Sequence, residues 1–168
     1  RHVIYCNEME LDAYGIDLSE SAISLARKWG SVKNIPRIEQ VFNQGDIRYL
    51  PWADEFFAFA LSHAVLDSMP FEFARVAVIE LARVMEPGGL FYCDLISGDN
   101  SEHAREFSGE ETVATDHENS TIQTYFNMQK IDSLFVGLFE VVECLLIRRE
   151  NIFSGSYTSR YHLVLSRK

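Results

Sequence analysis

Strand-length apolar runs alternate with helical segments along this chain, and this alternation restricts the fold more than any other feature. Near-continuous apolar runs occupy residues 56–61 and 90–96. Between them, apolar residues recur at helical spacing: Ala74, Ala77, Val78, Leu81 and Met85. Strands that are apolar on both faces are typical of parallel sheets covered by helices. The sequence therefore predicts an α/β fold with a doubly wound, mostly parallel sheet.

The first fifty residues predict two helices and two short strands. Residues 2–9 are expected to be helical, and residues 13–16 to form a strand. Ser19 is a suitable N-cap for the next helix, and Gly30 is expected to end it. The apolar face of that helix is expected to hold four residues: Ala22, Ile23, Ala26 and Trp29. Residues 38–42 are expected to form the second strand.

The remaining residues continue this alternation and end in two strands. Pro70 is expected to open a helix, and residues 86–89, Glu-Pro-Gly-Gly, to end it and turn the chain. Residues 97–121 are expected to be a polar loop or a broken helix. A helical stripe follows, formed by Ile131, Leu134, Phe135 and Leu138. Residues 139–147 and 157–165 then predict an antiparallel pair. No break in composition indicates a second domain.

Charge and cysteine content restrict the partners and the location. The chain carries 15 Lys and Arg against 25 Asp and Glu, a net charge of −10. A polyanion would be repelled, so no nucleic-acid partner is expected. No apolar run is long enough to span a membrane, and residues 1–5 lack the pattern of a signal peptide. Three widely spaced cysteines, Cys6, Cys93 and Cys144, indicate buried reduced thiols and a cytoplasmic protein.

Asp17 is the first candidate for a binding residue. It follows a predicted strand and precedes a predicted helix. In α/β nucleotide-binding folds a carboxylate at this place accepts hydrogen bonds from the ribose hydroxyls. The alternative is that Asp17 caps the following helix, and the sequence does not decide between the two.

Two further candidates follow later strands. Asp46 could accept a hydrogen bond from an adenine amino group while the backbone N–H of Ile47 donates to the ring, although Gly45-Asp46 is also an ordinary turn. Ser62 and His63 leave the strand at residues 56–61. His63 could face a substrate as a base or donor, and the alternative is a packed imidazole.

These features, in this order, resemble the class I S-adenosylmethionine-dependent methyltransferases. The resemblance runs from Arg1 to Lys168 and includes the turn at residues 86–89 and the final strand pair. The stretch from Val3-Ile4-Tyr5 through residues 14–22 looks much like the small-molecule branch of this superfamily. The resemblance implies that S-adenosyl-L-methionine is the cofactor. It assigns cofactor binding to six residues: Asp17, Leu18, Asp46, Ile47, Ser62 and His63.

The family fold implies a Rossmann-like sheet of order 3-2-1-4-5-7-6 with an antiparallel last strand. The predicted strands match strands 2 to 7, whereas strand 1 and its Gly-rich loop have no counterpart in residues 1–168. We therefore expect residues 1–168 to be one methyltransferase domain that is incomplete at its N-terminus.

The resemblance implies methyl transfer to a small-molecule acceptor and assigns no catalytic residue. Residues 97–121 are the expected lid. Their seven acids either form a solvated face or favour a cationic acceptor. His117 and Tyr125 could line the pocket near the end of this lid. Asp94, Asp99 and His103 match no standard metal site, so no metal is expected. The oligomeric state is left open.

Two other functions compete with methyl transfer. A nicotinamide-dependent oxidoreductase also needs an acid after its second strand, but it does not call for Gly45-Asp46 or for the C-terminal strand pair. A non-catalytic interaction domain that keeps the fold is the other alternative, and the intact Asp17 and Asp46 argue against it.

Overall fold

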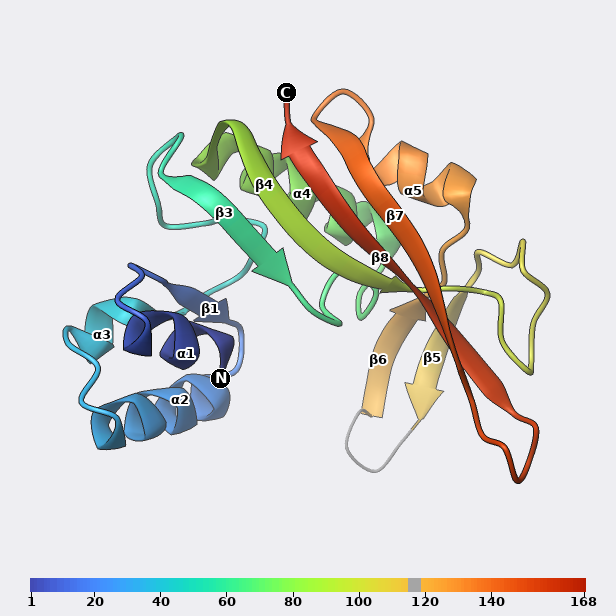
Figure 1. Ribbon diagram of the computed structural model, residues 1–168, viewed down its shortest axis with the longest axis horizontal. Helices are drawn as coiled ribbons and strands as arrows, with labels where there is room; N and C mark the ends of the chain where they lie inside the picture. The colour runs from blue at the N-terminus through green and yellow to red at the C-terminus, as the bar shows by residue number, and fades with distance from the viewer. Residues whose placement is uncertain (115–118) are drawn as a thin grey trace. The chain divides into compact units, whose positions relative to one another are not determined.

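Residues 1–114 and 119–168 are described by the computed structural model in Figure 1. The chain forms two compact units, Arg1–Leu50 and Pro51–Lys168. We describe each unit by itself. Among the described residues, no helix is both long enough and apolar enough to cross a membrane.

The first unit is a small α/β unit built around two parallel strands. Its elements are α1 (His2–Glu8), β1 (Gly15–Asp17), α2 (Glu20–Val32), α3 (Ile38–Val41) and β2 (Phe42–Gln44). β1 pairs in parallel with β2, and Gly15 lies opposite Phe42. The buried core consists of Ile4, Ile23, Ile35, Val41 and Phe42. The helix predicted over residues 2–9 is confirmed for residues 2–8, and Met9 is its C-cap. The Ser19 N-cap is confirmed, since Ser19 Oγ accepts a hydrogen bond from Ala22 N at 3.2 Å.

The strand predicted over residues 38–42 is wrong for four of its five residues. Ile38–Val41 form the helical turn α3, and only Phe42 belongs to a strand. The apolar positions 38, 41 and 42 have the i, i+3, i+4 spacing of a helix. Val41 is buried, and Ile38 packs against the same core. Packing of this face overrides the apparent alternation of a strand.

The prediction that Gly30 ends α2 is also wrong. The helix continues to Val32, and Gly30 is buried inside it. A Cβ atom at residue 30 would lie 2.2 Å from Ile38 Cδ1, so the absence of a side chain lets the segment after α2 pack closely. Trp29, which was placed on the apolar face, is 53% exposed.

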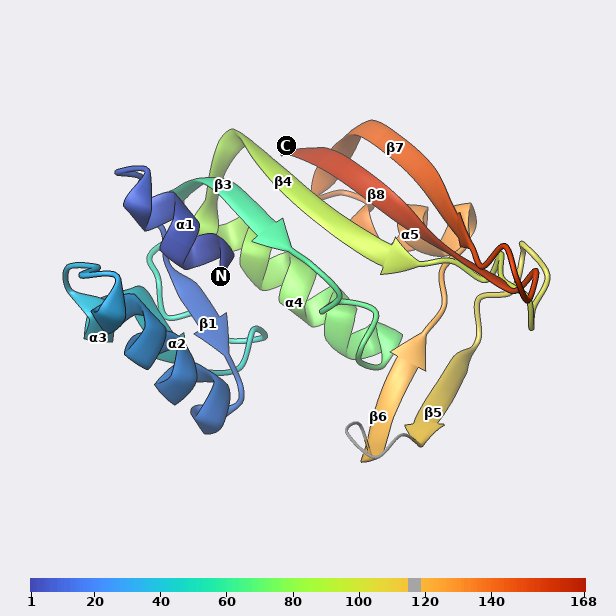
Figure 2. The same cartoon turned by 60° about the horizontal axis from the view of Figure 1, so that its bottom comes forward.

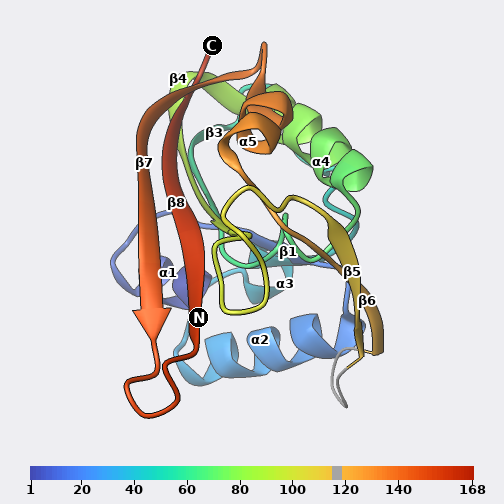
Figure 3. The same cartoon turned by 90° about the vertical axis from the view of Figure 1, so that its right-hand side faces the viewer.

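The second unit contains a four-stranded sheet, two helices and a hairpin. Its elements are β3 (Phe57–Ser62), α4 (Phe71–Val84), β4 (Met85–Ile96), β5 (Glu110–Ala114), β6 (Asn119–Thr124), α5 (Met128–Phe135), β7 (Phe139–Glu150) and β8 (Tyr157–Arg167). The sheet order is β3-β4-β8-β7. β3 and β4 are parallel, and β8 is antiparallel to both neighbours. Figure 3 shows α4 and α5 together on one side of this sheet.

These pairings agree with the predicted α/β class and with the predicted antiparallel pair. β1 and β2 pair as strands 2 and 3 would, and β3-β4-β8-β7 has the order 4-5-7-6. The helix that follows Pro70 is α4, but it ends at Val84, so Met85 already belongs to β4. The C-terminal edge of the parallel pair β3–β4 carries the candidate residues of this unit.

Residues 97–121 are not wholly the loop or broken helix that was predicted. Residues 110–114 and 119–121 belong to an antiparallel hairpin of β5 and β6, in which Glu111 pairs with Gln123 and Thr112 with Ile122. Ser97 forms a parallel bridge with Phe126, which holds the hairpin near the carboxyl end of β4 (Figure 2). The periodicity of a segment does not indicate which distant segment it pairs with, so it did not predict this hairpin.

Candidate active site

Asp17 ends β1 and is exposed. Its Oδ1 accepts a hydrogen bond from Ser19 N at 2.8 Å. Capping of α2 is carried out by the Ser19 side chain. The contact with Ser19 N orients the carboxylate at the strand end and uses only one of its two oxygens.

The segment around Asp46 lies beside Asp17 within the first unit. Gly45 N donates to the carbonyl oxygen of Asp17 at 3.0 Å, and Gln44 Nε2 donates to that of Leu18 at 3.3 Å. The structure thus brings the two predicted acidic segments to one edge of the β1–β2 pair. Leu18 itself is 72% exposed, so its side chain is accessible at this edge.

Arg48 is a partner of Asp46 that sequence reasoning missed. Its Nη2 lies 2.6 Å from Asp46 Oδ2, its Nε lies 3.0 Å from both oxygens, and its backbone N–H donates to Oδ1. These bonds lower the pKa of the Asp46 carboxyl, with the side-chain bond to Arg48 as the largest cause. Asp46 therefore stays ionised, and any ligand donor would share its oxygens with Arg48. Ile47, between them, is partly buried.

Ser62 and His63 stand at the carboxyl end of β3 in the second unit. The Oγ of Ser62 is buried and has no hydrogen-bond partner within the described parts of the chain. The imidazole of His63 is 49% exposed, and its Nδ1 lies 2.9 Å from Asp94 Oδ2. The next residue, Ala64, has a φ of 53°, a left-handed conformation that turns the backbone sharply after the strand.

Asp94 on β4 is the centre of a charged network. It is fully buried, and its Oδ1 accepts a hydrogen bond from Ala64 N at 2.8 Å. Its Oδ2 accepts a hydrogen bond from Arg160 Nε, also at 2.8 Å. Burial alone would raise the pKa of Asp94, but the bond from Ala64 and the charges of Arg160 and His63 hold this pKa below its usual value. Asp94 is therefore an anion that fixes both the turn at Ala64 and the ring of His63.

Asp67 extends this network beneath the turn. It is 1% exposed, its Oδ2 accepts a hydrogen bond from Ile96 N at 2.8 Å, and Arg160 Nη2 pairs with the same oxygen. Burial raises the pKa of Asp67. Sequence reasoning missed Asp67 and Arg160 as site residues. The available signal was a charged residue inside each apolar strand, Asp94 in β4 and Arg160 in β8, since such charges are buried only when paired.

An aromatic cluster lies at the base of the β5–β6 hairpin. The His103 ring stacks on Phe107 at 4.0 Å between centroids, and Tyr125 meets it edge-on at 5.0 Å. Burial raises the pKa of Tyr125. His117, which was predicted beside Tyr125, lies outside the described residues. Among residues 1–114 and 119–168, no three His, Cys, Asp or Glu side chains form a group that could hold a metal ion.

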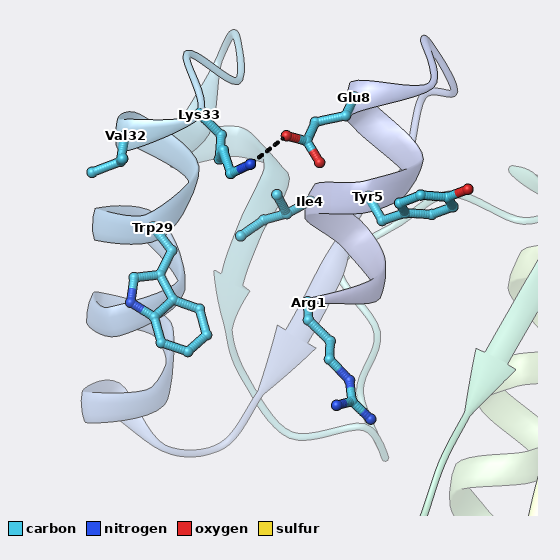
Figure 4. A pocket seen from close by; sticks show the side chains of 7 residues that line it. All are labelled: Arg1, Ile4, Tyr5, Glu8, Trp29, Val32 and Lys33. Carbon is cyan, nitrogen blue, oxygen red and sulfur yellow. Dashed lines mark ion pairs between the residues drawn. The ribbon is translucent and has the colours of Figure 1, made fainter.

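A separate groove lies between α1 and α2 in the first unit (Figure 4). Ile4 and Trp29 line it, and an ion pair between Lys33 Nζ and Glu8 spans it at 3.0 Å. None of the predicted cofactor residues lines this groove.

Comparison with known proteins places this arrangement in a family. The family model described as a methyltransferase domain matches residues 2–93, which span both predicted acids and the end of β3. A search among curated proteins finds no match.

Solved structures share the fold at low sequence identity. A structure of S-adenosylmethionine-dependent methyltransferases from Methanosarcina mazei is 19% identical with a TM-score of 0.70, covering 91% of this chain and 80% of that chain. The PH0226 protein from Pyrococcus horikoshii is 17% identical with a TM-score of 0.70, and the match covers 99% of this chain and 76% of that chain.

A third structure is the 1,6-didemethyltoxoflavin-N1-methyltransferase of Burkholderia thailandensis, solved with 1,6-didemethyltoxoflavin and S-adenosylhomocysteine bound. It is 17% identical with a TM-score of 0.64, covering 100% of this chain and 66% of that chain. At these identities the likeness concerns the fold. The family model, in contrast, matches more than half of the sequence, and the chain therefore belongs to the methyltransferase-domain family.

Proposed function

We propose that this methyltransferase binds S-adenosyl-L-methionine and transfers its methyl group to a small-molecule acceptor. The observation that carries the proposal is the placement of two acids, Asp17 at the carboxyl end of β1 and Asp46 just after that of the adjacent parallel strand β2. Ligands of α/β sheets bind at this edge. Both acids lie within the segment that matches the family model.

The proposed contacts follow from the chemistry of these groups. Asp17 accepts hydrogen bonds from the ribose hydroxyls, with Leu18 beside it. Asp46 accepts from the adenine amino group, and the backbone N–H of Ile47 donates to the ring. The backbone of Ser62 and His63 borders the methionine part. The residues fit such a ligand because Asp17 keeps one oxygen outside its bond to Ser19.

The reaction needs orientation more than acid–base groups from the chain. When bound, the cofactor supplies an activated methyl group on a sulfonium. The protein has to hold the acceptor in line with the S–CH3 bond and exclude water from it. Residues 97–121, with the β5–β6 hairpin, are the proposed lid for this purpose.

The remaining parts of the proposal concern location and partners. Cys6, Cys93 and Cys144 are free thiols, which supports a cytoplasmic location. The net charge of −10 supports the absence of a nucleic-acid partner.

Calorimetric titration with S-adenosylhomocysteine tests the proposal. In Asp17→Ala the dissociation constant should rise about 10- to 100-fold, because the loss of a charged hydrogen-bond partner costs about 1.5–3 kcal/mol. Asp12→Ala is the matched control, since Asp12 is an exposed acid of the same unit that pairs with Arg37. An unchanged constant in Asp17→Ala would remove this residue from the site, and no binding by the wild-type protein would refute the proposed function.

A further inference from the structure

The turn at residues 63–69, which follows β3, is attached to the rest of the second unit through two groups of Asp67. The side chain of Asp67 reaches β4 and β8, because its Oδ2 accepts a hydrogen bond from Ile96 N at 2.8 Å and pairs with Arg160 Nη2. The main-chain carbonyl of the same residue accepts a hydrogen bond from Thr124 N on β6, also at 2.8 Å. Asp67 thus connects the β5–β6 hairpin to the four-stranded sheet.

The contacts between this turn and β6 are reinforced by two side chains. Thr124 is fully buried, and its Oγ1 donates a hydrogen bond to Met69 O at 2.6 Å. Gln123 Nε2 donates to the carbonyl oxygen of Asp67 at 2.6 Å. Asp67 is itself only 1% exposed. Its carboxyl group therefore reaches water only if the turn moves, and that movement breaks the hydrogen bonds to β6.

Two buried acids share one guanidinium in this part of the unit. Arg160 pairs with Asp67 through Nη2 and with Asp94 through Nε. Asp94 has a donor for each of its oxygens, since Ala64 N donates to Oδ1 and Arg160 Nε to Oδ2. In contrast, Oδ1 of Asp67 is buried and has no hydrogen-bond partner among residues 1–114 and 119–168. A buried anion with an unpaired oxygen is costly, so Asp67 is the acid of this pair on which a proton is favoured.

We propose that Asp67 is a pH-sensitive latch between the turn at residues 63–69 and the β5–β6 hairpin. With a proton on Oδ1, the network holds one carboxylate against one guanidinium, and the turn stays bound to β6. When the turn opens, the carboxyl group of Asp67 meets water and releases this proton to it. Opening is therefore favoured as the pH rises. The latch concerns the hairpin itself and does not depend on what the protein binds.

The direction of the pH dependence follows from proton linkage. Burial raises the pKa of Asp67 in the folded protein. A group of this kind stabilises the closed state fully below its ordinary pKa of about 4, and this stabilisation is lost as the pH rises through the raised pKa. Release of one proton on opening increases the opening constant by up to tenfold per pH unit within that window. Above the raised pKa the opening constant is constant again.

Other titratable groups have to be separated from Asp67 in any test. Asp67 is bound by uncharged groups on β6 and is faced by two charged groups, Asp94 on β4 and Arg160 on β8. Two histidines lie one contact further away, since His63 pairs with Asp94 and His162 lies opposite Asp94 on β8. Their titration persists when Asp67 alone is replaced, so a substitution at Asp67 separates its proton from theirs.

Hydrogen exchange at single amides, measured by NMR on the full chain between pH 4 and pH 8, tests the latch. Thr124 N–H reports on the carbonyl side of Asp67, and Ile96 N–H reports on its carboxyl side. Protection factors give the opening constants, because they remove the intrinsic pH dependence of exchange. The variants are Asp67→Asn, whose amide has the shape of the protonated acid, and Asp132→Asn, a control at an exposed acid of α5.

In the wild-type protein the opening constants at both amides should rise together above about pH 4, by up to tenfold per pH unit, and then level off. Asp67→Asn should lose this rise, and Asp132→Asn should keep it. Three results would overturn the inference: no rise in the wild type, an unchanged rise in Asp67→Asn, or a rise at Ile96 without one at Thr124. The wild-type profile decides the matter even where Asp67→Asn fails to fold.

Discussion

At the residue scale, Gly30 illustrates how one position controls the packing of the first unit. A side chain at this position would meet Ile38 Cδ1, because a Cβ atom there would lie only 2.2 Å away. Gly30→Val should therefore lower the free energy of unfolding by about 1–3 kcal/mol, as overpacked cores do. Chemical denaturation measures this change. Ser31→Val, at the next and exposed position of α2, is the control and should change stability by less than about 0.5 kcal/mol. If Ile38→Ala fails to reduce the cost of Gly30→Val, the clash is not its cause.

At the element scale, the β5–β6 hairpin is the part of residues 97–121 suited to act as a lid. A two-stranded hairpin is marginally stable alone, and this one is held at its base by bonds from Thr124 N to Asp67 O and from Tyr125 N to Gly109 O. Hydrogen exchange of residues 110–114 and 119–121 should be faster than that of β4 in the free protein. It should slow when S-adenosylhomocysteine and an acceptor are both bound. The β7–β8 pair serves as the internal control and should not change. Full protection of the hairpin in the free protein would contradict a lid.

At the scale of the whole molecule, ligand-linked stability separates methyl transfer from the nicotinamide alternative. A ligand at about 100 times its dissociation constant stabilises the native state by about 2.7 kcal/mol. For a chain of this length that raises Tm by about 5–10 °C. S-adenosylhomocysteine should produce this shift, and NAD should produce none. A thermal-shift series with both ligands measures it. A shift with NAD alone would favour an oxidoreductase.

The sequence by itself determined the features that depend on neighbouring residues. Ser19 is the cap of α2 because its hydroxyl reaches a backbone N–H three residues ahead. The pair β7–β8 follows from two β-rich runs separated by a short turn. Asp17 and Asp46 were predicted at strand ends, where the structure has them, and their roles in binding stay predictions.

Only the tertiary structure decided the features that depend on distant residues. Residues 38–41 are helical because their apolar face packs on the core of the first unit, although the same letters also fit a strand. The position of the His63 ring depends on Asp94, and Asp94 depends on Arg160, which is 66 residues away from it in the chain. Periodicity reports which side of an element is apolar, but it carries no information on which distant charge lies opposite a buried one. Burial makes such a pairing obligatory, and the fold selects the partner.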